Sequence, residues 1–121
     1  MAGPFDAIRN FDRLVHDPSR LVILTALDAC GGSEFMPLQF LTGLSRGNLS
    51  LHLGKLFGKG LISIEKKDRL TRTATWIRLT PKGRKAVRSH WRRLEEVRRE
   101  VAQWVEIGRG RTLPDGGTGR R

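Results

Sequence analysis

The sequence predicts a mainly α-helical (α+β) fold, with one two-stranded β-hairpin and a long C-terminal helix. Three observations support this prediction. Apolar residues recur at helical spacing in several short segments before residue 58. Two segments rich in β-branched residues follow, separated by a polar connection. A Thr-Pro pair then opens a long segment with an apolar stripe. Because only 38% of the 121 residues are hydrophobic, we expect a small core.

Two helices are expected before the first glycine pair. Residues 5–15 carry apolar side chains three and four positions apart, which predicts a short amphipathic helix. His16 precedes Asp17 and Pro18, a favourable N-cap and first-turn pair, so a second helix is expected from there to about Ala29. This second segment is apolar on most of its surface, and we expect it to be the most buried helix. Gly31 and Gly32 end it.

The next two helices form a helix-turn-helix pattern. After a short link at residues 33–35, residues 36–42 predict a short helix that Gly43 ends. Ser45 then stands where an N-cap belongs, and a helix over residues 45–58 follows. Its apolar residues recur at one helical face: Leu49, Leu53 and Leu56. Two short helices joined by a glycine-containing turn are typical of this motif.

The other faces of helix 45–58 carry polar side chains with hydrogen-bond donors and acceptors. They are Arg46, Asn48, Ser50, His52 and Lys55. Groups of this kind contact base edges and phosphates in DNA complexes. A solvated polar face is the ordinary alternative, because most amphipathic helices simply lie at a protein surface.

A basic hairpin is expected next. Residues 61–66 predict one strand and residues 73–79 a second, and the connection between them is polar. Its tip carries four basic residues: Lys66, Lys67, Arg69 and Arg72. Such a cluster suits contact with phosphates or the minor groove, and the alternative is a solvated hairpin tip.

Thr80 and Pro81 open a long helix that we expect to end at about Ile107. Apolar or aromatic residues form a heptad-like stripe along it: Val87, His90, Leu94, Val97, Val101 and Trp104. The stripe suits pairing with a second copy, and the alternative is packing on the chain's own first helix. Both contacts can form together, because Trp91 and Val105 lie off the stripe and offer apolar surface for packing within the chain. The predicted organisation is a core at 1–80, a dimerisation helix at 81–107 and a disordered basic tail at 108–121.

The net charge of +11 and the pI near 11.4 favour a polyanionic partner, nucleic acid first and an anionic membrane surface second. The charge is unevenly placed. Residues 1–44 contain three arginines and five acidic residues, whereas residues 45–80 contain eight basic and two acidic residues. The basic excess therefore begins at Arg46, within the fourth helix.

Several functional classes are not expected. Cys30 is the only cysteine, so no intrachain disulfide is possible, and its place at the end of an apolar helix predicts a small buried residue rather than a redox sensor. His16, His52 and His90 fall on different predicted elements without metal-ligand spacing, so no metal or cofactor is expected. Neither a phosphate loop, a nucleophile–base pair nor paired carboxylates are recognisable, so we do not expect an enzyme.

The location predicted from sequence is the cytoplasm. No apolar run approaches the roughly 18 residues of a membrane span. The first six residues lack a basic segment followed by an apolar core, so no signal peptide is expected.

Four motifs in order carry a resemblance to a known family. They are Asp-Pro-Ser-Arg-Leu-Val-Ile-Leu at 17–24, Leu-Ser-Arg-Gly-Asn-Leu-Ser-Leu-His-Leu at 44–53, Gly-Leu-Ile at 60–62 and Ile-Arg-Leu-Thr-Pro-Lys-Gly-Arg at 77–84. Over about residues 8–106 the chain resembles the bacterial and archaeal winged helix-turn-helix transcriptional regulators. Within them it is most similar to the short MarR-like and ArsR-like proteins.

The resemblance implies a DNA-binding transcription regulator, usually a homodimer, that reads the major groove of double-stranded DNA with helix 45–58. It places Lys55 near the DNA backbone, and it places six positions facing the groove: Ser45, Arg46, Asn48, Ser50, Leu51 and His52. It places wing contacts at Lys67, Arg69 and Arg72. Two departures from the family pattern matter. Cys30 stands alone, whereas metal-sensing ArsR members carry cysteine pairs or His and acid clusters. Only one terminal helix follows the wing, so a large ligand pocket is not expected and the resemblance identifies no small-molecule effector.

A second function stays open. The same architecture would serve a winged-helix module that binds RNA or protein without DNA sequence specificity. Steep salt dependence without preference among DNA sequences would favour that alternative.

Overall fold

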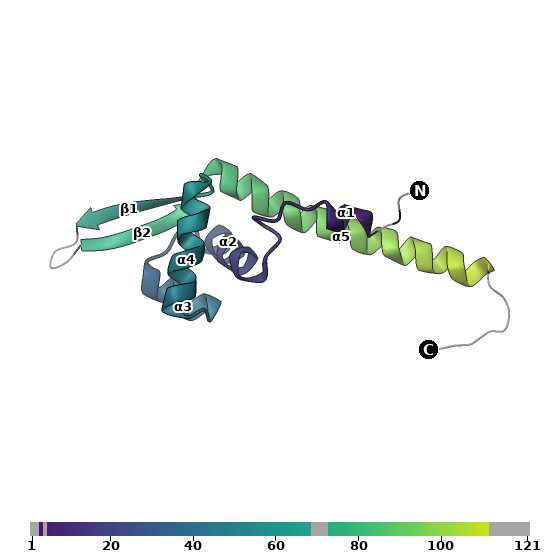
Figure 1. The fold of residues 1–121 in the computed structure, drawn as a ribbon, viewed down its shortest axis with the longest axis horizontal. Helices are drawn as coiled ribbons and strands as arrows, with labels where there is room; N and C mark the ends of the chain where they lie inside the picture. Colours follow the sequence, from purple (N-terminus) through teal and green to yellow (C-terminus); the bar gives the residue numbers. More distant parts are fainter. Residues whose placement is uncertain (1–2, 4, 69–72, 112–121) are drawn as a thin grey trace. The chain divides into compact units, whose positions relative to one another are not determined.

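The structure is a computed structural model that describes residues 3, 5–68 and 73–111, with side chains described as far as residue 109. Its elements are the helices α1 (Asp6–Arg9), α2 (Pro18–Cys30), α3 (Phe35–Thr42), α4 (Arg46–Gly58) and α5 (Pro81–Arg111), and the strands β1 (Ile62–Asp68) and β2 (Thr73–Leu79) (Figure 1). The predicted fold class is confirmed. The chain forms two units, Asp12–His90 and Met1–Phe11 with Trp91–Arg121.

Helix α2 begins and ends as its sequence predicts. The Asp17 carboxylate accepts a hydrogen bond of 3.0 Å from the backbone N–H of Arg20, and Pro18 occupies the first turn. Burial acts to raise the pKa of Asp17, but the backbone N–H groups of Arg20 and Ser19 and the nearby positive charge, chiefly that of Arg20, together outweigh it, and the pKa lies below the ordinary value of 3.8. Gly31 adopts a left-handed conformation with φ of 76° and ends the helix.

The helix-turn-helix is also confirmed. Helix α3 begins one residue earlier than predicted and ends at Gly43, whose φ is 73°. Ser45 Oγ accepts from the backbone N–H of Asn48 at 3.1 Å, so it caps α4 as expected.

The hairpin pairs β1 with β2 in antiparallel register, from Ile62 opposite Leu79 to Asp68 opposite Thr73. Strand β1 runs two residues beyond the predicted end. The sequence prediction missed one partner of this hairpin, because Ser33 was expected to be only a link. Its N–H and C=O exchange two 2.8 Å hydrogen bonds with Ile77. A single bridge residue leaves no periodic pattern in the sequence.

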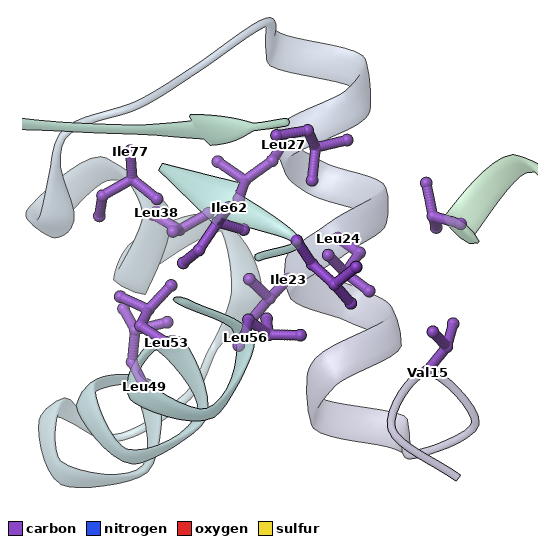
Figure 2. Close-up of a cluster of buried hydrophobic side chains, with 13 residues drawn as sticks. Val15, Ile23, Leu24, Leu27, Leu38, Leu49, Leu53, Leu56, Ile62 and Ile77 are labelled. Atoms are coloured by element: carbon purple, nitrogen blue, oxygen red, sulfur yellow. The ribbon is translucent and has the colours of Figure 1, made fainter. Parts of the chain in front are cut away.

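The hydrophobic core of the unit Asp12–His90 lies between α2, α4 and the hairpin (Figure 2). Figure 2 shows side chains of the two helices turned toward each other and toward the strands: Ile23, Leu24 and Leu27 from α2, Leu49, Leu53 and Leu56 from α4, and Ile62 and Ile77. Each fully buried side chain of this size stabilises the fold by roughly 1.5–3 kcal/mol. This burial fixes which face of α4 remains outside.

The first turns of α5 pack into the same unit. Thr80 Oγ1 accepts from the backbone N–H of Gly83 at 3.0 Å and donates to the Gly60 carbonyl at 2.6 Å. A Cβ on Gly83 would collide with the carbonyl oxygen of Leu61, so this close approach requires glycine. One turn later, Arg88 donates two hydrogen bonds of 3.1 Å to the Asp28 carboxylate.

The N-terminal helix is much shorter than predicted. A helix was expected over residues 5–15, but α1 covers only Asp6–Arg9. The Asp12 carboxylate accepts from the backbone N–H of Leu14 at 2.9 Å, and the Asp12 carbonyl accepts from Val15 and His16. Local bonds of this kind favour a turn over a helix, which explains why the prediction was wrong.

The end of the long helix was also predicted wrongly. Helix α5 continues to Arg111, so residues 108–111 are helical where a disordered tail was expected. Glycine weakens a helix but keeps its N–H, and the next proline is Pro114, so the hydrogen-bond ladder passes through Gly108. Residues 112–121 lie outside the described part of the chain.

Cys30 is exposed, so the prediction of a buried cysteine was wrong. The buried residues of α2 are Ile23, Leu24 and Leu27. Cys30 follows in the last turn, beyond the last residue that α2 contributes to the core.

Candidate nucleic-acid interface

Helix α4 separates an apolar face from a polar one. Leu49, Leu53 and Leu56 are buried in the core. Six of the seven residues expected at DNA are exposed: Ser45, Arg46, Asn48, Ser50, Leu51 and Lys55. The seventh, His52, is half-buried. The cap at Ser45 orients the first turn, so the polar face begins at the helix N-terminus, where backbone N–H groups favour anions.

Arg46 has a partner that sequence reasoning missed. Its guanidinium carbon lies 5.9 Å from the centre of the Phe35 ring on α3, within cation–π range. This contact restricts a long side chain in the first turn of α4. No local sequence signal indicated it, because the two residues belong to different helices.

Three glycines lie on the outer face of α4, opposite the buried leucines. Gly47, Gly54 and Gly58 follow the helical spacing of exposed Leu51. A Cβ built on any of the three would have no neighbouring atom within 4 Å. Internal packing therefore does not explain these glycines, and in the interior of a helix, where Gly54 lies, glycine costs about 1 kcal/mol relative to alanine. An outer face without Cβ atoms allows another molecule to approach the backbone closely.

His52 contacts a residue of α2. Its Nδ1 lies 3.1 Å from Nη1 of Arg20. Arg20 belongs to the motif that begins at Asp17, but no pattern in the sequence indicates that its side chain reaches α4. Its position in the first turn of α2 was predictable, but the direction of its side chain was not.

The described part of the hairpin presents two of the four predicted basic residues. Lys66 and Lys67 are exposed on β1, opposite Thr75 and Ala74. Lys67 Nζ lies 5.7 Å from the Trp76 ring. Arg69 and Arg72 lie outside the described residues.

Trp76 also anchors the base of the hairpin. A Cβ on Gly32 would come within 2.7 Å of the Trp76 ring, so the indole lies against the glycine backbone there. Gly32 has φ of 139° and precedes Ser33, which bridges to Ile77. Strand β2, which pairs with the strand that carries Lys67, is therefore tied to the segment between α2 and α3.

The six residues of the predicted dimerisation stripe differ in how far they are buried. Val87 and His90 are 1% and 4% exposed, and both belong to the unit Asp12–His90. In that unit Val87 joins the hydrophobic core, and Nε2 of His90 lies 3.0 Å from Nδ1 of His16. Val97 is also buried, Leu94 and Val101 are half-buried, and Trp104 is 47% exposed. Val105 and Ile107 add further exposed apolar surface beside Trp104.

Within the described ranges, no three His, Cys, Asp or Glu side chains are grouped as a metal site requires. Among those same residues, no helix combines the length and the apolar character needed to cross a membrane.

Comparison with known proteins supports the fold and the family. The chain matches the model of the winged helix DNA-binding domain over residues 19–97. It is similar to the structure of a transcriptional regulator homologue from Pyrococcus horikoshii OT3, with 23% identity, coverage of 84% of this chain and 96% of that one, and a TM-score of 0.67. No curated protein matches the sequence.

Two further solved structures share the fold. A MarR-family transcriptional regulator from Silicibacter pomeroyi is 22% identical, with coverage of 84% of this chain and 63% of that one and a TM-score of 0.59. BpsR from Bordetella bronchiseptica, whose DNA binding is regulated by 6-hydroxynicotinic acid, is 17% identical, with coverage of 82% and 81% and a TM-score of 0.63.

The family match spans the parts that build the candidate interface. It begins at Ser19 in α2 and extends through the helix-turn-helix and the hairpin to Val97 in α5. The resemblance indicated by four sequence motifs is thereby confirmed at the level of the family. The chain belongs to the winged helix DNA-binding domain family.

Proposed function

We propose that this protein is a sequence-specific DNA-binding transcriptional regulator that inserts α4 into the major groove. The observation that carries the proposal is the division of α4, in which the leucines are buried while the donor-bearing residues are exposed. A helix anchored along one face and polar along the other fits the width of the major groove. The basic excess that begins at Arg46 supplies the attraction to a polyanion.

The proposal divides the contacts by chemistry. Arg46 and Asn48 are the candidates for base readout, because arginine pairs with guanine and asparagine with adenine through two hydrogen bonds. Lys55 and Lys67 are candidates for phosphate contacts, together with Arg69 and Arg72. The three outer glycines of α4 support a close approach of this helix to DNA.

We further propose that two copies pair through the last turns of α5. Trp104, Val105 and Ile107 are exposed apolar residues within four positions of one another. A second copy of this segment would cover them, and half-buried Leu94 and Val101 extend the same surface. Val87 is buried in the core and His90 is buried against His16, so we leave both out of this proposed contact. A two-fold dimer would read half-sites about one DNA turn apart, roughly 34 Å.

Selection of double-stranded DNA from a random pool tests the central claim. The full chain would be used at a fixed salt concentration, and bound DNA would be sequenced. We expect enrichment of a palindromic site with half-sites roughly 10 base pairs apart. Binding that depends steeply on salt but enriches no sequence would contradict specificity and would favour the RNA- or protein-interaction module.

A further inference from the structure

Arg20 joins the start of α2 to the recognition helix. Its side chain is 12% exposed and its donors point into the protein. Nε donates to the Leu14 carbonyl at 2.6 Å, Nη2 donates to the Arg13 carbonyl at 3.2 Å, and Nη2 lies 3.6 Å from the Asp17 carboxylate. These contacts hold the guanidinium in one place, so the remaining contact, to His52 on α4, has a fixed direction.

That contact determines the tautomer of His52. A guanidinium has five N–H donors and no acceptor. Because Arg20 Nη1 lies 3.1 Å from Nδ1 of His52, Nδ1 must be the acceptor and the ring proton must be on Nε2. A proton on Nδ1 would direct two donors at each other. Among the described residues, no protein group forms a hydrogen bond with Nε2 of His52.

We propose that Arg20 is a positioning residue for DNA binding, which presents His52 to DNA as a fixed Nε2–H donor. This inference rests on the proposed function of α4. His52 follows Asn48 by four residues and precedes Lys55 by three, so the three lie along one side of the helix. The partner would be an acceptor on DNA, either a phosphate oxygen or N7 or O6 of a purine.

The first test detects the tautomer without DNA. Long-range ¹H–¹⁵N correlation spectra of the free full chain at pH 8 distinguish a proton on Nε2 from one on Nδ1. We expect His52 to show only the Nε2–H form, and the variant Arg20→Met to show a mixture of both forms. A wild-type His52 protonated on Nδ1 would overturn the proposal, whether or not the protein binds DNA.

The second test measures whether Arg20 acts through His52. The variants Arg20→Met, His52→Ala and the double variant would be titrated with the DNA selected by the wild-type chain. We expect Arg20→Met to weaken binding by about tenfold in the wild-type background and by less than about twofold in the His52→Ala background. The same loss in both backgrounds would show a merely structural role for Arg20 and would contradict the inference.

A third variant separates the two nitrogens of His52 and does not disturb Arg20. In His52→Asn, Oδ1 keeps an acceptor near the position of Nδ1, but the donor at the position of Nε2 is lost. We expect unfolding like that of the wild type and DNA binding about as weak as that of His52→Ala. Wild-type affinity in His52→Asn would refute the Nε2–H contact.

The form of the loss in His52→Asn identifies the acceptor. An equal loss on all DNA sequences indicates a phosphate, and an altered preference at one base pair indicates a base. If the wild-type chain binds DNA without any sequence preference, the proposed function fails, and the tautomer result still decides the role of Arg20 in the free protein.

Discussion

Arg46 and Asn48 are exposed in the first turn of α4, and they differ in what holds them. The guanidinium of Arg46 lies over Phe35, whereas the backbone N–H of Asn48 donates to the Ser45 cap. The first contact restricts the direction of the Arg46 guanidinium itself, and the second uses only the backbone of Asn48, whose side chain is exposed. We therefore expect the Arg46 guanidinium and the Asn48 side-chain amide to discriminate bases.

Replacing Arg46 or Asn48 by alanine should relax sequence preference. Loss of a two-bond contact to a base costs about 1–3 kcal/mol of discrimination against the wrong base pair. The measurement is a comparison of affinities for the selected site and for single-base-pair variants of it. Lys85→Ala, at an exposed lysine of α5, is the control for loss of one positive charge. A uniform loss on all sites would assign these residues to phosphates instead.

Gly54 offers a test in which stability and binding should move in opposite directions. Alanine at this helical position meets no atom within 4 Å, so Gly54→Ala should stabilise the fold by up to about 1 kcal/mol. The added methyl group lies on the outer face of α4, so the same variant should bind DNA more weakly. Chemical denaturation and DNA titration measure the two effects.

Gly83→Ala is the matched control for Gly54→Ala. It makes the same change in a helix, but its Cβ would collide with the Leu61 carbonyl. We therefore expect Gly83→Ala to destabilise the protein. If Gly54→Ala left DNA affinity unchanged, the close approach of this face to DNA would be wrong.

At the scale of elements, the start of α2 depends on one carboxylate. Asp17 accepts the Arg20 N–H and lies beside the Arg20 guanidinium, 3.6 Å from Nη2. Its lowered pKa means that the ionised cap is favoured in the folded state. The stabilisation is complete above the ordinary pKa of 3.8 and is lost as the pH falls through the lower pKa of the folded state.

Asp17→Ala should therefore destabilise the protein by about 1 kcal/mol at pH 7, the usual cost of removing an N-cap. The difference from the wild type should shrink as the pH falls below 3.8. Urea unfolding at pH 7 and at about pH 3 measures both values. Asp17→Asn is the control, because asparagine caps a helix without a charge. A difference from the wild type that did not change with pH would show that the charge of Asp17 contributes nothing.

The lysines of the hairpin are expected to contribute to DNA affinity and to its salt dependence. Replacing Lys66 and Lys67 together by alanine should weaken binding to all DNA sequences and flatten the dependence of log affinity on log salt by up to about 2. The reason is that each lysine that neutralises a phosphate releases a counterion. Titrations at several salt concentrations, with Lys85→Ala for comparison, give the slopes. An unchanged slope would mean that both lysines remain solvated in the complex.

At the scale of the whole molecule, the number of copies that assemble determines how many half-sites are bound. Trp104→Ala combined with Val105→Ala should shift a dimer toward monomer, because both side chains are exposed and apolar in the single chain. Sedimentation velocity over a range of concentrations would show the shift. Gln103→Ala, at an exposed polar neighbour, is the control and should leave the mass unchanged. A wild-type chain that stays monomeric at high concentration would contradict the dimer.

Local chemistry in the sequence determined the start of α2 and α4, the end of α2 and α3, the pairing of two short strands and the apolar face of α4. The cap at Ser45 and the stop at Gly43 act within three or four residues, so the sequence alone indicates them. Local patterns gave a wrong prediction for the N-terminal segment, where apolar spacing and a side-chain hydrogen bond favour different structures. The apolar spacing of residues 5–15 indicated a helix, but the Asp12 carboxylate bonded to the backbone of Leu14 instead.

Only the tertiary structure decided which distant residues meet. Ser33 pairs with Ile77. His16 lies against His90, which is 74 positions away, and Arg20 reaches His52, which is 32 positions away. These partners depend on how α2, α4, α5 and the hairpin pack around the core, and packing follows no spacing along the chain. For that reason the sequence identified α4 as the helix most suited to DNA, whereas the structure showed that Val87 and His90 are buried and that Nη1 of Arg20 lies 3.1 Å from Nδ1 of His52.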